Sequence, residues 1–234
     1  MFARYAHAPN ALGYCGPAAS GSMVDLPTAE VRAMARRFSG AWPYLRVMAR
    51  LTGIADPLDR RLVESYWLGG GIGARLDPAE FMAELLAVIG PVAGQYWAHL
   101  TTELVPEAAA NHCFHVFGVY PWTRLLGRGE HPLFVLDSCR ITWGTVLART
   151  DDQITVSTRR LSWDGGRLAL SHPEARQVAV WIDGYSPAPD VREHDLVALH
   201  WDRLCGLLEP EQVRDLADST ARQLRVTNDR LKRT

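Results

Sequence analysis

The fold of this chain is decided at residues 133–147, which read LFVLDSCRITWGTVL. Apolar and β-branched side chains dominate this stretch, and short segments of the same kind follow at residues 154–157, 167–170, 178–182 and 196–201. We therefore expect strands at 134–136, at 141–147 and at each of these later segments. The sequence Trp163-Asp164-Gly165-Gly166 predicts a tight turn between two of them. Several short strands at this spacing predict a small β-barrel.

Beyond this β-rich part the pattern becomes helical. Glu209-Pro210 precedes a segment in which Val213, Leu216 and Leu224 recur at helical spacing opposite a charged face. Residues 131–234 are therefore expected to form a small barrel followed by a C-terminal helix.

The part of the chain before residue 131 contains the N-cap and stop residues that are typical of short helices. Asp56-Pro57 and Asp77-Pro78 each offer an N-cap followed by a first-turn proline, and Gly69 and Gly90 follow as stops. Further helices are expected at 27–38, 43–52 and 91–103. We interpret residues 1–130 as an α-helical domain, which makes the protein a two-domain α+β protein.

Composition excludes several classes of protein. The chain has 234 residues, 25 Lys plus Arg, 26 Asp plus Glu and a formal net charge of −1. This balance argues against a nucleic-acid partner, which requires a concentrated basic face. We expect no membrane partner, because no apolar run approaches the ~20 residues of a membrane span, and the sequence shows no signal peptide. We expect a cytoplasmic protein whose four scattered cysteines are thiols or ligands rather than disulfides.

Two motifs in the second half carry a family resemblance. Cys139 opens the pattern C-x-I-x-x-G-x-V, and His200 closes the segment HDLVALH at residues 194–200. Over residues 137–230 the chain resembles the hydrogenase assembly chaperone family of the HypC/HupF type. That family is a small, OB-like barrel with a terminal helix. It binds the iron–cyanide–carbonyl fragment of nickel–iron hydrogenase and passes it to the large-subunit precursor.

The resemblance implies roles for particular residues. Cys139 and His200 match the essential cysteine and the strand-closing histidine of that family, so they are the expected iron ligands. Cys139, Arg140 and Trp143 are the expected contacts with two partners, the hydrogenase large-subunit precursor and the iron–cyanide assembly protein. Cys15 is a further expected contact, because its glycine-lined turn can approach a partner and expose the thiol. The implied function is that of an accessory chaperone rather than an enzyme.

This chain also departs from the family pattern. Cys139 is internal instead of following the initiator methionine, and Trp143 stands where the family has proline. Trp201 follows His200 where the family has small residues. The complete chain, with its FARY and GYCGP segments near the start, resembles an uncharacterised actinobacterial family associated with hydrogenase genes.

A second cluster of ligand-type residues supports a rival interpretation. In the segment NHCFH, residues 111–115, His112 and His115 would share one face of a helix and could reach one metal, with Cys113 between them. Cys15 lies in a glycine-lined turn and could act as a thiol nucleophile. The rival is therefore a cysteine- or metal-dependent enzyme using Cys15, His112, Cys113 and His115. Core packing of these residues, in a plain interaction module, is the third alternative.

Other motifs give weaker indications of a functional site. The run Gly69-Gly70-Gly71-Ile72-Gly73 lacks the strand and the Lys-Ser/Thr pair of a phosphate loop, so we interpret it as a flexible connection between helices. Glu80, Glu84, Glu103 and Glu107 are expected to be helix-surface carboxylates. Cys205 is expected to pack in the core.

Overall fold

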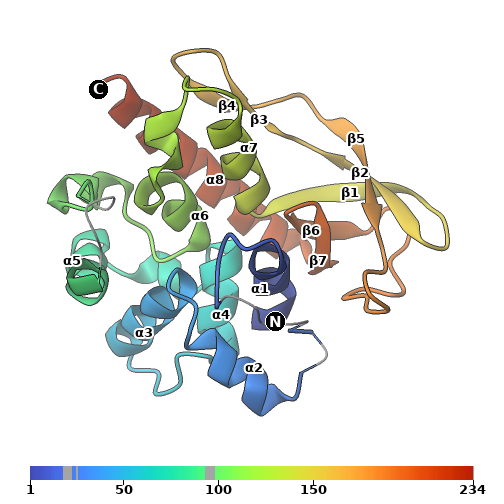
Figure 1. The fold of residues 1–234 in the computed structure, drawn as a ribbon, viewed down its shortest axis with the longest axis horizontal. Helices are drawn as coiled ribbons and strands as arrows, with labels where there is room; N and C mark the ends of the chain where they lie inside the picture. Colours follow the sequence, from blue (N-terminus) through green and yellow to red (C-terminus); the bar gives the residue numbers. More distant parts are fainter. Residues whose placement is uncertain (18–22, 25, 93–97, 234) are drawn as a thin grey trace.

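The computed structural model describes residues 1–17, 23–24, 26–92 and 98–233 as a mixed α+β protein. The first part of the chain is helical, as expected, and contains α1 (Phe2–Ala11), α2 (Thr28–Ala35), α3 (Ala41–Thr52), α4 (Arg60–Leu68) and α5 (Pro78–Ile89). The 3₁₀ turns η1 (Gly73–Arg75), η2 (Gly90–Val92) and η4 (Thr102–Glu107) complete it. These helices occupy one side of the molecule, and the antiparallel sheet occupies another (Figure 1).

The capping residues explain where two of these helices begin. Asp77 caps α5 as predicted, because its carboxylate accepts from the backbone N–H groups of Ala79 at 3.0 Å and Glu80 at 2.8 Å. The predicted cap of α4 is wrong, since Asp59 caps the helix by accepting from the N–H of Arg61. Asp56 instead accepts from the N–H of Leu58 and pairs with the guanidinium of Arg32.

Two further differences concern the ends of this helical part. Residues 93–97 of the predicted helix at 91–103 lie outside the described residues, and the described flanks are the 3₁₀ turns η2 and η4. The first helix, α1, has no counterpart in the sequence-based expectations. Its proline, Pro9, lies inside the helix and weakens the local signal.

The middle of the chain is helical for longer than predicted. It contains α6 (His112–Phe114), the π-turn η5 (His115–Val119), η6 (Pro121–Leu125) and α7 (His131–Cys139). The strand predicted at 134–136 is wrong, because these residues belong to α7. Pro132 lies in the first turn of that helix, and its buried side chains include Val135, Leu136 and Cys139.

The sheet agrees with the predicted β-rich half in its coarse form. Five strands pair antiparallel in the order β5-β2-β1-β6-β7, namely β1 (Thr142–Arg149), β2 (Gln153–Thr158), β5 (Glu174–Ala179), β6 (Leu196–His200) and β7 (Arg203–Leu207). The sheet curls into a half-barrel whose edge strands β5 and β7 approach each other. A separate hairpin, β3 (Leu161–Trp163) and β4 (Leu168–Leu170), contains the predicted Asp164-Gly165 turn between its strands.

The C-terminal helix α8 (Pro210–Leu231) is present as predicted and crosses the middle of the molecule (Figure 1). A capping box starts it, in which Gln212 accepts from the N–H of Glu209 at 2.9 Å. The glycine run at 69–73 packs against this helix. A Cβ at Gly70 would enter the carboxylate of Asp215, so this run is a close packing contact rather than a flexible connection.

The interior joins the helical and β-rich parts. One hydrophobic cluster contains residues of α1, α3, α4 and α5 together with Ile141, Ala198 and Leu216.

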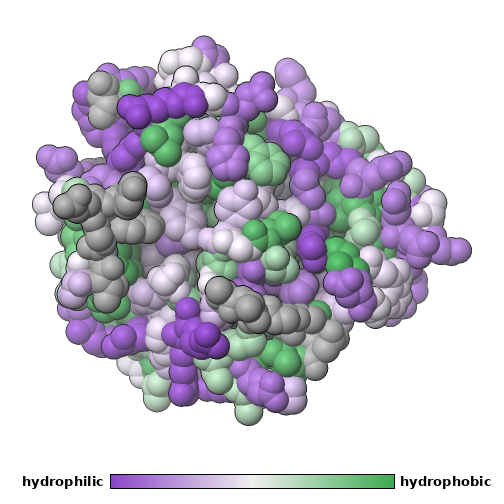
Figure 2. All heavy atoms as spheres, in the orientation of Figure 1, coloured by the Kyte–Doolittle hydropathy of each residue, from purple (hydrophilic) through white to green (hydrophobic). Residues whose placement is uncertain are grey.

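The expectation that Glu107 lies on a helix surface is wrong, because its side chain is only 3% exposed and pairs with Arg230 of α8 at 2.5 Å. Within the described residues, no helix is both long and apolar enough to cross a membrane. Apolar side chains on the face shown in Figure 2 are scattered among hydrophilic ones.

Candidate metal centre

The short helix α6 and the turn η5 place two histidines in the interior. The side chain of Asn111 accepts from the N–H of Phe114 at 3.0 Å and so fixes the start of α6. The rings of His112 and His115 then stack at 5.9 Å between centroids, with 28° between their planes. Both side chains are buried, each 4% exposed. A π-turn at this point is notable because such turns often occur at functional sites.

Cys139 and His200 come together because they terminate neighbouring elements. Cys139 ends α7 just before β1, and His200 ends β6, which pairs antiparallel with β1. The backbone N–H of Trp201 also donates to the carbonyl of Ser138 at 2.9 Å, which ties the two ends together. The result is a compact group in which one ligand atom each of His112, Cys139 and His200 lies within 4.8 Å of the other two.

Hydrogen bonds indicate which ring nitrogen of each histidine in this group carries the proton and which has a lone pair. Nδ1 of His200 donates to the backbone carbonyl of Tyr5 at 2.6 Å, so Nε2 is the nitrogen without a proton. Nε2 of His112 donates to the carbonyl of Cys139 at 2.9 Å, and Nδ1 accepts from the hydroxyl of Tyr66 at 3.2 Å. His200 thus donates one N–H to a backbone carbonyl and presents the other nitrogen, which is the usual form of a metal-ligating histidine. Nδ1 of His112 would bind a metal only after releasing the hydroxyl of Tyr66.

Burial sets the protonation of these groups. It lowers the pKa of His200 to about 4. It also lowers the pKa of His112 well below its ordinary value, and repulsion from His200 and His115 lowers that pKa further. Both imidazoles are therefore neutral near pH 7. Burial raises the pKa of the Cys139 thiol, as does nearby Cys15, while the indole of Trp201 lowers it. A bound cation would reverse this balance, because coordination deprotonates a thiol.

Several buried polar atoms beside this group lack a hydrogen-bond partner. Among the described residues they belong to five aromatic side chains: the hydroxyl of Tyr44, Nε1 of Trp67 and Trp201, Nε2 of His200, and both nitrogens of His115. Their rings contact one another or the His112–Cys139–His200 group, with centroids 5.4 Å apart for Tyr44 and His115 and 5.8 Å for Trp67 and His200. Buried polar groups are rarely left unpaired, so their concentration here favours a polar or ionic ligand.

Backbone strain also occurs at this place. Trp201 and Asp202 form the two-residue turn between β6 and β7 with φ of 52° and 58°. Such a turn favours glycine, asparagine or aspartate, and a tryptophan there is strained. The side chain of Trp201 is nevertheless 7% exposed, and Tyr14 packs on it with ring centroids 4.0 Å apart. The strained turn therefore places Trp201 beside Cys139, with Tyr14 packed on it. We call the side chains of Trp201 and Tyr14 the aromatic cover.

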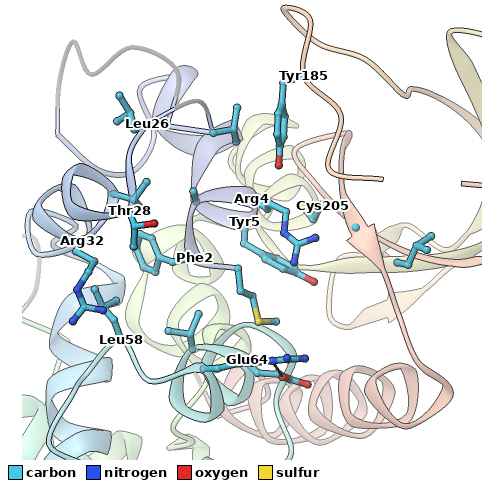
Figure 3. A pocket seen from close by; sticks show the side chains of 18 of the residues that line it. Phe2, Arg4, Tyr5, Leu26, Thr28, Arg32, Leu58, Glu64, Tyr185 and Cys205 are labelled. Carbon is cyan, nitrogen blue, oxygen red and sulfur yellow. Dashed lines mark ion pairs between the residues drawn. The ribbon is translucent and has the colours of Figure 1, made fainter. Parts of the chain in front are cut away.

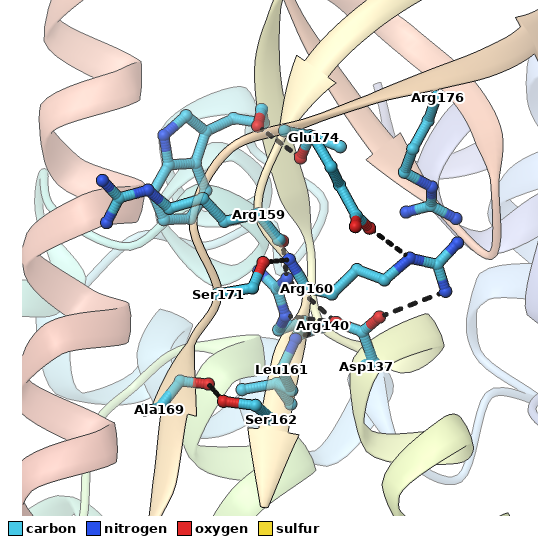
Figure 4. A network of polar contacts seen from close by, with 12 residues as sticks. Asp137, Arg140, Arg159, Arg160, Leu161, Ser162, Ala169, Ser171, Glu174 and Arg176 are labelled. Carbon is cyan, nitrogen blue, oxygen red and sulfur yellow. Dashed lines mark hydrogen bonds and ion pairs between the residues drawn. The ribbon is translucent and has the colours of Figure 1, made fainter.

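A polar network fixes the helix end that presents Cys139 (Figure 4). Asp137 accepts from Nε and Nη2 of Arg140 at 3.1 and 2.9 Å and from the N–H of Leu161 at 2.8 Å. Arg160 approaches Asp137 at 4.0 Å and pairs with Glu174 at 2.7 Å. Arg140 is 2% exposed, so in this conformation it supports α7 from within instead of presenting its charge to a partner.

The structure brings the two sequence-based groups of candidates into one interior. Cys15 lies beside His115, since both border the same small space at Gly40. Two candidates lie elsewhere. Burial raises the pKa of the Cys113 thiol to about 12, and its polar neighbours are Thr220, Arg140 and Arg222. Trp143 packs, half-buried, against the main hydrophobic cluster.

Local sequence patterns do not indicate the residues that complete the centre. Tyr5 supplies a backbone carbonyl, Tyr44 and Trp67 supply buried polar groups, and Gly40 allows the backbone to pack closely on His115. The quoted FARY segment contains Tyr5, and this is the one signal that could have indicated it. A carbonyl acceptor has no side-chain signature, so pattern analysis cannot find it.

A surface cavity of about 710 Å³ adjoins the same helix α1 (Figure 3). Met1, Arg4, Glu64 and Cys205 contribute to its lining, and the guanidinium of Arg4 points into it. Tyr5 connects this cavity with the centre, because it lines the cavity and its carbonyl binds His200. Cys205 is 1% exposed and belongs to the main hydrophobic cluster, as expected for a packing residue.

Together the fold and this interior define an α+β protein with a buried thiol–imidazole centre beneath an aromatic cover. The whole chain, residues 1–234, matches a family described as "Family of unknown function (DUF6390)", and the chain belongs to that family. Comparison with curated proteins and with solved structures gave no match.

Proposed function

We propose that this protein is an accessory protein of nickel–iron hydrogenase assembly that holds a transition-metal cargo at His112, Cys139 and His200. One observation carries the proposal: ligand atoms of these three buried residues lie within 4.8 Å of one another. Around a tetrahedral ion, bonds of about 2.0–2.3 Å place ligand atoms about 3.5 Å apart, so small side-chain movements would complete the site.

The donor set suits iron. A thiolate with neutral imidazoles binds iron, copper or zinc in preference to the hard cations magnesium and calcium. The cargo implied by the resemblance is iron carrying cyanide and carbon monoxide. The indole N–H groups of Trp67 and Trp201 and the hydroxyl of Tyr44 are donors, and the nitrogen of a cyanide ligand is an acceptor. These groups therefore match the polarity of such a cargo.

The hydrogenase context rests on the sequence resemblance around Cys139 and His200. Its cysteine and histidine positions fall on the ends of adjacent elements and lie side by side here, which supports the resemblance. The proposed partners are the large-subunit precursor and the iron–cyanide assembly protein. Both would meet the face formed by Tyr14 and Phe134, which are 38% and 51% exposed and contact Trp201.

The buried position of the centre adds a requirement. Cys139 is 3% exposed, whereas a ligand at an accessible edge would suit direct transfer. Transfer to a client therefore requires Trp201 and Tyr14 to separate, which exposes Cys139. The strained turn at Trp201 lowers the cost of that opening.

The test is purification of the protein without oxygen from cells that assemble a nickel–iron hydrogenase. We expect iron in the wild type, together with infrared bands of cyanide and carbon monoxide, and their loss in Cys139→Ala. Cys205→Ser is the matched control, because that buried thiol lies in the main hydrophobic cluster. If Cys139→Ala leaves both iron content and hydrogenase maturation unchanged, the proposed function is wrong.

A further inference from the structure

We infer that Cys15 and His115 form a second, transient metal position, through which a transition-metal ion passes between the surface and the His112–Cys139–His200 centre. This inference rests on the proposed function, because it supplies a path to the proposed centre. A centre beneath an aromatic cover needs such a path, since its cysteine and both histidines are at most 4% exposed.

Gly40 shows that the two ligand atoms share one space. A Cβ built on Gly40 would lie 2.8 Å from Nε2 of His115 and 3.7 Å from Sγ of Cys15. Nε2 of His115 and Sγ of Cys15 therefore both lie within 4 Å of one point beside Gly40, and they are neighbours. Position 40 is restricted to glycine, because any Cβ there would press on the imidazole of His115.

His115 is the observation that points to a ligand. Its side chain is 4% exposed, and neither Nδ1 nor Nε2 has a hydrogen-bond partner. Leaving such a group unpaired costs about 1–3 kcal/mol. Its neighbours are the rings of Tyr44, Tyr120 and His112, with the Tyr120 centroid at 4.4 Å. A buried, neutral imidazole among aromatic rings presents a lone pair that a metal ion would satisfy.

Cys15 connects this position with the surface. It follows Tyr14 in the turn after α1, where residues 11–14 are exposed and Cys15 itself is partly exposed. Its thiol points inward, since burial raises its pKa to about 11 and the hydroxyl of Tyr120 donates to it. Tyr14 packs on Trp201, which faces Cys139. The turn thus lies under the same aromatic cover as the buried centre.

The ligand count explains why this position would be transient. One thiolate and one imidazole bind an ion more weakly than the thiolate and two imidazoles of the inner centre. An incoming divalent ion displaces the proton of Cys15, which passes to solvent, and forms a metal–sulfur bond. Transfer then breaks that bond and forms the bond to Cys139, whose proton returns to Cys15. The metal keeps its oxidation state throughout, so no oxidant or reductant is needed.

Stopped-flow mixing of metal-free protein with Co²⁺, without oxygen, tests this path. Thiolate coordination to Co²⁺ gives a charge-transfer absorption that reports loading. We expect Cys15→Ser and His115→Phe to load about tenfold or more slowly than the wild type, yet to reach the same stoichiometry and final spectrum. Gly40→Ala should slow loading as well, because the added Cβ would push the imidazole of His115 out of its present position. Cys113→Ser is the matched control and should load at the wild-type rate.

Each outcome has a definite meaning. If Cys15→Ser and Gly40→Ala both load at the wild-type rate, the path is wrong while the inner centre stands. If Cys15→Ser lowers the final stoichiometry, Cys15 is a permanent ligand and the transient position is wrong. If the wild type takes up no Co²⁺, this inference and the metal centre of the proposed function fail together.

Discussion

Acidification should destabilise the metal-free protein well above the range in which carboxylates titrate. Burial lowers the pKa of His115 and His200 to about 4, against about 6.5 in an unfolded chain, and shifts His112 in the same direction. Between these two pKa values the histidines are protonated in the unfolded chain but stay neutral in the folded protein. The free energy of unfolding therefore falls as pH falls through this window, and it is insensitive to these groups above about pH 7.

The size of this effect follows from the same values. Each pH unit in the window costs about 1.4 kcal/mol per histidine. At about pH 5, His115 and His200 together should therefore lower the free energy of unfolding by about 4 kcal/mol, and His112 adds to the loss. Asp215 acts in the opposite sense, because burial raises its pKa, but it is one partly solvated carboxylate. A loss of this size is a large fraction of the stability of an ordinary domain.

The assay is urea denaturation at several pH values between about 7 and 5, with a chelator and a thiol reductant present. His115→Phe should remove about a third of the pH dependence, because it deletes one of three buried imidazoles. His172→Gln, at an exposed position, should leave it unchanged. A free energy of unfolding that stays constant over this range would show that these imidazoles are not buried and neutral, and would refute the reasoning.

Three further substitutions have definite expected results. Trp201→Asn relieves a strained turn but removes the cover of Cys139, so thiol labelling of Cys139 should accelerate at temperatures well below the unfolding transition of the variant; unchanged labelling would contradict the cover. Gly70→Ala places a Cβ against a carboxylate of α8 and should cost about 1–3 kcal/mol by chemical denaturation; wild-type stability would contradict the close packing. Glu107→Gln leaves the cation of Arg230 buried without its counter-charge, which should cost about 3 kcal/mol or more, and a loss below about 1 kcal/mol would show that the pair is not buried.

Local signals in the sequence predicted those parts of the fold that are determined locally. The Asp77-Pro78 cap, the Asp164-Gly165 turn and the Glu209-Pro210 start of α8 depend on neighbouring residues only, and all three are present. The apolar run at 134–136 predicts a strand, and this prediction is wrong, because the run is helical. A short apolar run fits a strand or a buried helix equally well, and Pro132 two residues upstream favoured the helix.

The centre illustrates what patterns along the chain cannot determine. Cys139 and His200 could be paired in advance because a family resemblance links them. The spacing of His112 and His115 predicts a separate, rival site, yet in the fold the two rings stack on each other and His112 belongs to the same group as Cys139 and His200. No pattern along the chain places His112 beside Cys139 and His200, because their meeting depends on the packing of α6 against α7 and β6. Cys113, adjacent to His112, points toward α8 instead.

X-ray absorption at the metal edge of the loaded protein tests the central claim most directly. For iron or cobalt bound to the wild type, the account predicts one sulfur neighbour at about 2.3 Å and imidazole nitrogens at about 2.0–2.1 Å. Cys139→Ala should lose the sulfur neighbour, and His200→Ala should lose imidazole scattering. A metal surrounded only by oxygen and nitrogen in the wild type, or a sulfur neighbour that persists in Cys139→Ala, would contradict a metal centre built on Cys139.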